Sequence, residues 1–312
     1  MRPDLRTPSG APAGDFAFGT MQFGGRADEA QSHAMYDACR AAGIRLFDTA
    51  YVYTDGASET LLGRFAASER DDLFIATKAS YTGGASRDNI LTTFDTSRKR
   101  LDMDVIDLLY MHRWDNDTPL EETFETLARL KAEGKIRHIG VSNYAAWQVT
   151  KAQAVAARFG VRIDVLQPMY NLVKRQAEVE ILPMCLAEGI VPVPYSPLGG
   201  GLLTGKYLDG GSGRLTEDER YAARYGVAAM HDGARGLCEI AAELGIDPAT
   251  LAVAWVGRHK ARPVPILSAR TAEQLQPSLA GMTFAMDDTL YARLSALSPT
   301  PPPATDRLEE SG

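Results

Sequence analysis

The sequence contains few cysteines and few histidines. Its 312 residues include three cysteines, Cys39, Cys185 and Cys238, which are odd in number and far apart. This pattern excludes a disulfide framework and favours buried thiols in a reducing compartment. The five histidines are spread along the chain without the spacing of a metal site, so we expect no bound metal.

Positive charge and long apolar runs are also scarce. The formal net charge of −7 gives no reason to expect nucleic acid or an anionic membrane as a partner. No apolar run is long enough to span a bilayer, and residues 1–14 lack the apolar segment of a signal peptide. We therefore expect a cytoplasmic protein.

Strand-like and helix-like segments alternate along most of the chain, and glycine follows most of the helix-like ones. The predicted strands are residues 16–20, 44–48, 73–77, 105–111, 136–141, 164–167, 191–195 and 264–267. The predicted helices include residues 28–42, 58–67, 86–101, 118–133, 145–159 and 177–188. This alternation predicts an α/β protein with a parallel sheet, and at this length it favours a closed (β/α)8 TIM barrel over an open sheet.

The chain shows no sign of an interdomain linker. We expect one barrel domain, 1–298, followed by a flexible proline-rich tail, 299–312. Residues 199–220 are rich in glycine and polar side chains and predict a long loop over the C-terminal mouth of the barrel.

Local patterns predict where several helices begin. Ser58 has the character of an N-cap. Thr118 and Glu121 have the spacing of a capping box, with Pro119 at the first helical position. The dipeptide Asp247-Pro248 predicts an extra helix before the eighth strand.

Four polar side chains follow three successive strands. Asp48, Lys78 and His112 stand at the strand ends, and Tyr53 lies in the loop after Asp48. The ends of parallel strands share one side of the sheet, where such folds keep their active sites. There a lysine ammonium would lower the pKa of a tyrosine, and a neutral imidazole would donate to a carbonyl oxygen. The set can polarise and protonate a carbonyl, and a hydride cofactor would supply the missing nucleophile.

The motif around these residues resembles a known family. The stretch from Asp48 to Glu59 reads Asp-Thr-Ala-x-x-Tyr-x-x-Gly-x-Ser-Glu, which is similar to the signature of the aldo-keto reductase family. The resemblance covers roughly residues 16–297. Further matches follow in the order of the family, at residues 77–78, 111–112, 140–144, 167–171, 194–198 and 201–207.

The resemblance implies a (β/α)8 barrel that reduces an aldehyde or ketone to an alcohol with NADPH, with NADH also possible. Tyr53 would be the general acid in reduction and the base in oxidation. Lys78 and Asp48 would tune its pKa, and His112 would orient the carbonyl. The substrate would be a small carbonyl compound, and a monomer is favoured.

The resemblance also implies a set of cofactor contacts. The nicotinamide side would be held by Thr20, Met21, Ser142, Asn143, Gln167 and Tyr195. The pyrophosphate path would be lined by Ser196, Leu198, Gly199 and Lys206. The adenosine side would be formed by Ser268, Arg270, Gln274 and Ser278. Among these, Arg270 would bind the 2′-phosphate and favour NADPH over NADH.

Three features depart from the family pattern. Ser268 stands where a glycine is usual, and Pro277-Ser278 replaces the usual Glu-Asn pair. A proline there predicts a kinked or late-starting helix, if the helix begins at Thr271, and a loosened adenine contact. Residues before Phe16 have weak strand character, so the N-terminal hairpin of the family is expected to be abbreviated or absent.

Two alternatives remain open on the sequence alone. The chain could be a cofactor-binding regulatory or interaction protein of the same fold with little turnover, as potassium-channel β subunits of the family are. It could also be a Schiff-base lyase that uses Lys78. The Ser142-Asn143 and Tyr195 motifs argue against the lyase.

Overall fold

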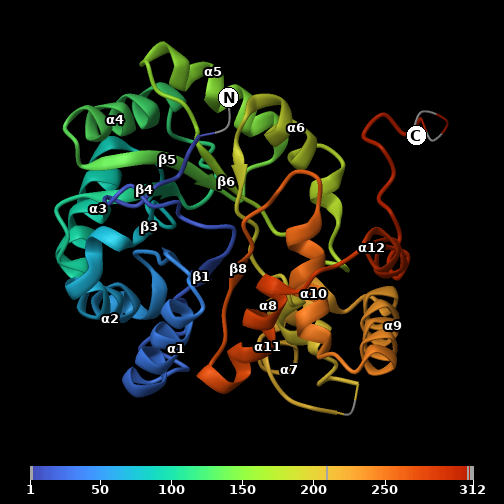
Figure 1. The fold of residues 1–312 in the computed structure, drawn as a ribbon. Coiled ribbons are helices and arrows are strands. Elements are labelled where there is room, and N and C mark those ends of the chain that lie inside the picture. The colour runs from blue at the N-terminus through green and yellow to red at the C-terminus, as the bar shows by residue number, and fades with distance from the viewer. Residues whose placement is uncertain (1–2, 209, 308, 310–312) are drawn as a thin grey trace.

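The structure is a computed structural model that describes residues 3–208, 210–307 and 309. Its centre is an eight-stranded sheet in the order β7-β6-β5-β4-β3-β2-β1-β8, in which every neighbouring pair is parallel (Figure 1). This α/β architecture fits a (β/α)8 barrel. The strands are β1 Ala17–Gly19, β2 Leu46–Asp48, β3 Phe74–Ala79, β4 Ile106–Met111, β5 Ile136–Ser142, β6 Val165–Gln167, β7 Val191–Pro192 and β8 Ile266–Leu267.

Helices surround the sheet and connect its strands (Figure 1). Within the described residues, no single helix is long and apolar enough to cross a membrane. Helices α9 and α10 together reach that length and apolar character, but the chain bends by 106° between them. The helices are α1 Glu29–Ala41, α2 Ala57–Ala66, α3 Arg87–Leu101, α4 Leu120–Ala132, α5 Ala146–Arg158, α6 Ile181–Glu188, α7 Arg214–Glu217, α8 Glu219–Tyr225, α9 Ala228–Leu244, α10 Pro248–Arg258, α11 Ala272–Thr283 and α12 Asp288–Ser295.

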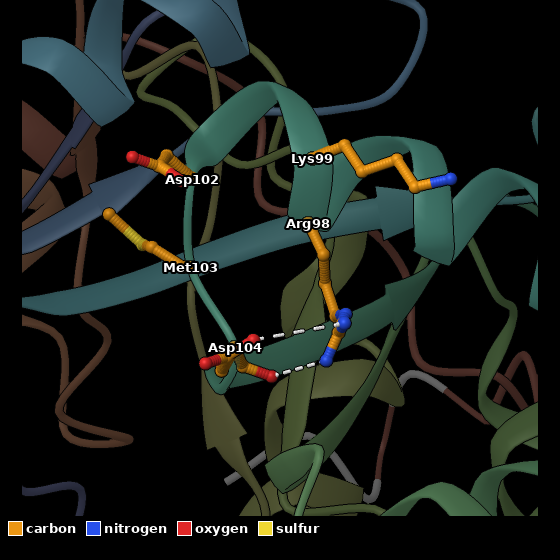
Figure 2. A pocket seen from close by; sticks show the side chains of 5 residues that line it. All are labelled: Arg98, Lys99, Asp102, Met103 and Asp104. Atoms are coloured by element: carbon orange, nitrogen blue, oxygen red, sulfur yellow. Dashed lines mark hydrogen bonds and ion pairs between the residues drawn. The ribbon is translucent and has the colours of Figure 1, made fainter.

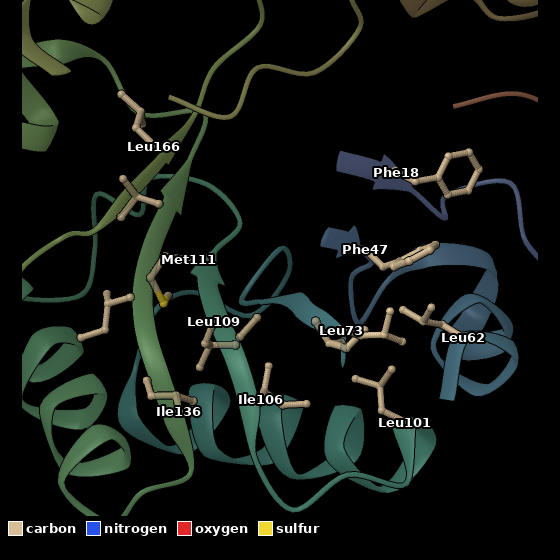
Figure 3. Packing of buried hydrophobic residues seen from close by; sticks show 14 of the residues in the cluster. Phe18, Phe47, Leu62, Leu73, Leu101, Ile106, Leu109, Met111, Ile136 and Leu166 are labelled. Carbon is tan, nitrogen blue, oxygen red and sulfur yellow. The ribbon is translucent and has the colours of Figure 1, made fainter. Parts of the chain in front are cut away.

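Strand side chains alternate between two apolar clusters because successive residues of a strand point to opposite faces. Phe74 and Ala76 of β3 lie in an inner cluster of strand and loop residues, whereas Ile75 packs in an outer cluster with the helices. In the outer cluster, Phe18 and Phe47 point away from β1 and β2 toward the helices (Figure 3). The sheet is thus buried on both faces, as its apolar strands predict.

A short N-terminal hairpin packs against the inner cluster. Arg6 and Pro12 form an antiparallel bridge, and Leu5 and Ala13 contact the inner cluster. Arg137 of β5 donates from Nη1 to the Arg6 carbonyl at 2.7 Å, which ties the hairpin to the sheet. The hairpin, predicted to be abbreviated or absent, is therefore present in a short form.

Two predicted helix starts are wrong. Helix α2 begins at Ala57 with Gly56 at the N-cap, so Ser58 lies inside the helix, where its buried hydroxyl donates to the Thr20 carbonyl at 2.8 Å. Helix α4 begins at Leu120 with Pro119 at the N-cap and no side-chain cap.

Neither half of the predicted capping box at α4 forms, because both side chains have other partners. Thr118 hydrogen bonds to the Asp115 carboxylate instead of the helix backbone. Glu121 points outward and accepts from Arg158 Nη1 at 2.9 Å. By contrast, the predicted helix start at Asp247-Pro248 is confirmed: α10 begins at Pro248, and the Asp247 carboxylate accepts from the Ala249 backbone N–H at 2.8 Å.

Several segments differ in extent from their predictions. Residues 199–220 are not one long loop, because they contain the 3-10 helix η4 Gly199–Thr204, all of α7 and the start of α8. The predicted helix 177–188 forms only from Ile181, after the 3-10 helix η3 Gln176–Glu178. The predicted strand 191–195 shortens to β7, since a proline has no N–H for a sheet ladder.

The helix that contains Pro277 does not start late. Helix α11 begins directly after Thr271, whose hydroxyl accepts from the Gln274 backbone N–H at 3.1 Å, and it continues through Pro277 to Thr283. The Pro277 carbonyl is held by the Thr250 hydroxyl at 2.7 Å, so helix α10 supports this turn of α11.

The predicted tail, 299–312, lies partly outside the described residues, because 308 and 310–312 are not among them. The chain is still attached to the fold at Ser298, whose hydroxyl donates to the Leu172 carbonyl at 2.5 Å. The flexibility of the tail stays a prediction.

Candidate active site

Four polar side chains meet at the C-terminal ends of β2, β3 and β4. Asp48 is the last residue of β2, Lys78 lies near the end of β3, and His112 directly follows β4. Tyr53 begins the 3-10 helix η1 Tyr53–Gly56, shortly after β2. Because these strands are neighbours in a parallel sheet, the structure brings the predicted tetrad together.

The Lys78 ammonium is the centre of this cluster. Its side chain is 0% exposed, and Nζ forms an ion pair with the Asp48 carboxylate. The same Nζ donates to the Thr49 carbonyl at 2.8 Å and to the Tyr53 hydroxyl oxygen at 3.1 Å. Lys78 therefore has three oxygen partners, which matches the three N–H donors of an ammonium group.

The charges of this buried pair are set by competing effects. Burial raises the pKa of Asp48, although Lys78 and a hydrogen bond from Gln167 act in the opposite direction. Burial alone would lower the pKa of Lys78, but the Asp48 carboxylate and Tyr53 outweigh it and raise that pKa above its usual range. The proton therefore stays on Lys78, and the pair is an ammonium facing a carboxylate at neutral pH.

Tyr53 keeps its proton in this environment. Although the residue is partly exposed, desolvation of its hydroxyl raises the pKa of Tyr53, and Lys78 lowers it only in part. The net direction is opposite to the sequence-based expectation of a lowered pKa. Lys78 acts as expected, but the sequence could not reveal how strongly burial would compete.

His112 is a neutral imidazole at neutral pH. Burial lowers its pKa to about 3, and the cations Lys78 and Arg113 add to this effect. Its ring contacts Tyr53 edge to face at 5.9 Å and Tyr81 at 4.8 Å between centroids. Nδ1 is buried without a hydrogen-bond partner among the described residues. A neutral imidazole can donate one N–H to a carbonyl oxygen.

The predicted nicotinamide residues form a hydrogen-bonded chain that ends at Asp48. Tyr195 donates from its hydroxyl to Asn143 Oδ1 at 2.7 Å, and Asn143 Nδ2 donates to Ser142 Oγ at 3.0 Å. Ser142 Oγ donates to Gln167 Oε1 at 3.1 Å, and Gln167 Nε2 donates to Asp48 Oδ2 at 2.8 Å. The structure thus brings four of the predicted cofactor residues next to the tetrad.

The remaining residues predicted near the nicotinamide and pyrophosphate lie on loops around this chain. Thr20 follows β1 and donates from Oγ1 to the Asp48 carbonyl at 3.2 Å, with the partly exposed Met21 next to it. Lys206 is exposed, and its Nζ lies 4.8 Å above the Tyr207 ring. The others are at the start of the segment that contains η4: Ser196, Leu198 and Gly199.

The predicted adenosine residues are only partly brought together. The Ser268 hydroxyl oxygen is buried without a hydrogen-bond partner among the described residues. Gln274 Oε1 accepts from the Arg270 backbone N–H at 3.3 Å, so these two residues are neighbours. Ser278 is 1% exposed within α11 and does not present its hydroxyl to solvent.

Glu217, which the sequence did not reveal, contacts the predicted site residue Arg270. Its Oε2 lies 3.0 Å from Arg26 Nη1 and 3.3 Å from Arg270 Nη2. Arg26 follows β1 and Arg270 follows β8, which are paired strands, so Glu217 ties α7 to the segments after both strands. No local pattern marks Glu217, because both partners are distant in the sequence.

A surface hollow elsewhere on the molecule has no part in this site. It lies between the end of α3 and the start of β4, where Arg98 Nη1 donates to the Asp104 carbonyl at 2.8 Å (Figure 2). His112 follows the other end of β4, so the hollow and the tetrad lie at opposite ends of this strand. The hollow is lined by Arg98, Lys99, Asp102, Met103 and Asp104.

Comparisons with known proteins identify a family and relatives. The model of the Aldo/keto reductase family matches residues 15–299. A relative in Bacillus subtilis (strain 168), Uncharacterized oxidoreductase YrpG, is 33% identical over 306 residues, which cover 91% of this chain and 91% of the relative.

Two further relatives have more specific names. A Probable voltage-gated potassium channel subunit beta of Oryza sativa subsp. japonica is 36% identical over 267 residues, 79% of this chain and 80% of the relative. Aflatoxin B1 aldehyde reductase member 2 of Rattus norvegicus is 40% identical over 212 residues, 66% of this chain and 58% of the relative.

Proposed function

The chain belongs to the aldo/keto reductase family, and we propose that it reduces an aldehyde or ketone to an alcohol with NADPH as hydride donor. The observation that carries the proposal is the buried Lys78 ammonium, which pairs with Asp48 and lies 3.1 Å from the Tyr53 hydroxyl oxygen. A phenol beside a buried cation is suited to protonating a carbonyl oxygen. The relative named as an aldehyde reductase supports the same substrate class.

The residues at the strand ends fit a nicotinamide cofactor. Ser142, Asn143 and Gln167 offer hydroxyl and amide groups of the kind that bind a carboxamide, and Tyr195 offers a ring for stacking. The unpartnered buried hydroxyl of Ser268 is a polar group that a ligand could satisfy. When bound, the reduced cofactor would supply the hydride.

The chain itself handles the proton. Tyr53, held protonated by burial, would donate its hydroxyl proton to the carbonyl oxygen as that oxygen gains negative charge. The Lys78 ammonium would then stabilise the phenolate at 3.1 Å, and Asp48 would keep Lys78 in place. The neutral imidazole of His112 would donate an N–H to the same carbonyl oxygen and orient it.

Sheet closure and a single domain belong to the same proposal. Beyond the strand pairs, the Val264 backbone N–H donates to the Pro192 carbonyl and the Ile266 N–H to the Pro194 carbonyl, both at 2.9 Å. These bonds link the segments of β7 and β8 and support a closed (β/α)8 barrel. We further propose a cytoplasmic protein without nucleic acid or membrane partners, supported by its few and widely separated cysteines and its net charge of −7.

A second candidate function is a cofactor-binding regulatory protein with little turnover. Its support is the relative from rice whose name describes a probable potassium channel subunit. The Schiff-base lyase has less support, because a nucleophilic lysine must lose its proton. The raised pKa of Lys78 and its contact with Asp48 oppose that loss.

A fluorescence titration of the purified protein with NADPH and NADH, followed by turnover assays on a panel of aldehydes and ketones, tests the proposal. We expect selective NADPH binding and oxidation of NADPH that depends on a carbonyl substrate. NADPH binding without turnover on any carbonyl would favour the regulatory function. Binding of neither cofactor would contradict both.

A further inference from the structure

We propose that Arg100 and Glu59 form a positioning pair that holds the catalytic Tyr53 against Lys78. This inference rests on the proposed function, in which Tyr53 donates the proton. Arg100 lies in the last turn of α3 and Glu59 in the first turn of α2. Arg100 Nη1 lies 3.2 Å from Glu59 Oε2, and neither residue contacts the reacting groups directly.

Arg100 contacts both ends of the segment that carries Tyr53. Nη1 donates to the Tyr51 carbonyl at 2.8 Å, and the guanidinium lies 4.8 Å above the Tyr51 ring. At the other end, Gly56 has φ of 96° and passes so close that a Cβ there would lie 2.4 Å from Arg100 Cζ. A side chain at Gly56 would displace the Arg100 guanidinium and would be strained at this φ, so one guanidinium lies against both ends of residues 51–56.

The segment between these contacts is strained. Thr54 and Asp55 have φ of 47° and 53°, in the left-handed region that non-glycine residues rarely adopt. Such a conformation persists only when its surroundings impose it. Contacts besides those of Arg100 also hold the segment. The Thr54 hydroxyl donates to the Phe23 carbonyl at 2.8 Å and accepts from the Ser58 N–H at 3.0 Å, and the Tyr51 N–H donates to the Lys78 carbonyl at 3.2 Å.

Glu59 explains why the guanidinium stays in place. Its side chain is 0% exposed, whereas that of Arg100 is 26% exposed. The second carboxylate oxygen accepts from the Thr77 hydroxyl at 2.6 Å, and Thr77 precedes Lys78 in β3. Glu59 thus joins the strand that holds Lys78 to the arginine that brackets Tyr53. The pair therefore controls the distance between the Tyr53 hydroxyl and Lys78 Nζ.

The test uses a variant in which both charges are removed. Arg100→Met alone would leave the buried Glu59 carboxylate without a counter-charge and destabilise the fold, so the variant is Glu59→Gln with Arg100→Met. The control is Arg64→Met. Arg64 lies in α2, as Glu59 does, and the change removes its exposed ion pair with Glu29 of α1. Three quantities are measured in the full chain: amide hydrogen exchange of residues 51–58, the Kd of NADPH, and kcat with its pH profile.

For the double variant we expect amide exchange in residues 51–58 to be about tenfold faster or more, while the strands stay protected. We expect kcat to fall about a hundredfold with the Kd of NADPH nearly unchanged, because misplacing a proton donor by about 1 Å has such an effect. In alcohol oxidation the rise of kcat with pH should move to higher pH, since Tyr53 loses stabilisation by Lys78. Arg64→Met should change none of these quantities.

A folded double variant with unchanged exchange in residues 51–58, or with kcat and pH profile close to those of Arg64→Met, would overturn the proposal. Arg100→Lys keeps a charge for Glu59 but lacks the guanidinium fork, so we expect faster exchange and an intermediate kcat. If the wild-type protein reduces no carbonyl, the proposed function fails, and the exchange of residues 51–58 still decides whether the pair holds the segment.

Discussion

Gln167 on β6 donates a hydrogen bond of 2.8 Å from Nε2 to Oδ2 of Asp48 on β2. A residue expected to hold the cofactor therefore also orients the buried carboxylate that pairs with Lys78. This contact joins the C-terminal ends of two strands that are not neighbours in the sheet. In the proposed function, it would couple cofactor binding to the proton donor Tyr53.

Replacing Gln167 with Leu should therefore affect both stability and cofactor binding. The buried Asp48 carboxylate would lose a donor, which costs about 1–3 kcal/mol of unfolding free energy. NADPH affinity should fall as well. Denaturant unfolding and a fluorescence titration measure the two effects. Gln276→Leu, at an exposed position of α11, is the matched control, and equal behaviour of the two variants would contradict the role of Gln167.

Arg270 and Glu217 predict how the protein distinguishes its cofactors. Arg270→Ala should raise the Kd of NADPH by about tenfold or more and change the Kd of NADH little. Only NADPH carries the 2′-phosphate that the guanidinium would bind. Glu217→Gln should lower the Kd of NADPH more than that of NADH, because the Glu217 carboxylate lies 3.3 Å from Arg270 Nη2 and would repel a phosphate there. Titrations with both cofactors measure these changes. Equal losses of affinity for NADPH and NADH in Arg270→Ala would show that Arg270 does not bind the 2′-phosphate.

The pKa directions predict opposite pH profiles for the two reaction directions. Burial raises the pKa of Tyr53 and lowers that of His112 to about 3, so at neutral pH the phenol is protonated and the imidazole is neutral. Reduction uses the phenol and should be nearly independent of pH between about 5 and 9. Alcohol oxidation uses the phenolate and should rise about tenfold per pH unit over that range. An acid limb in the reduction profile at the ordinary pKa of histidine would contradict the neutral, buried His112.

Lys78 should not form a Schiff base. Its ammonium is held by Asp48, and its pKa is raised, so no neutral amine is present to attack a carbonyl. Treatment with borohydride in the presence of an aldehyde or ketone should leave Lys78 unmodified, as measured by mass spectrometry of its peptide. Exposed lysines such as Lys206 serve as the internal comparison. An adduct confined to Lys78 would favour the lyase.

The tetrad could be predicted from sequence because each member depends on strand order. An apolar run predicts a buried strand, the strands are parallel, and their ends therefore meet on one side of the sheet. Asp48, Lys78 and His112 needed no knowledge of side-chain contacts. The dipeptide Asp247-Pro248 also predicted the start of α10, because the signal for that start is local.

The predictions that failed depend on tertiary contacts. Ser58 has the local character of an N-cap, but its hydroxyl is buried against Thr20 and Thr49, so α2 begins at Ala57 instead. The sequence predicted a lowered pKa for Tyr53, whereas the structure raises it. The prediction failed because burial, which raises this pKa, depends on the whole fold. Arg100 could not be recognised, because the backbone that it holds is distant in the sequence.

The most direct test of the account is replacement of Tyr53 with Phe. The change removes the hydroxyl oxygen that lies 3.1 Å from Lys78 Nζ and leaves the ring in contact with His112. We expect kcat for carbonyl reduction to fall by about 10²–10⁴-fold while the Kd of NADPH stays nearly constant, because the phenol acts only on the proton. Activity near that of the wild type, with NADPH bound as tightly as before, would show that Tyr53 is not the proton donor.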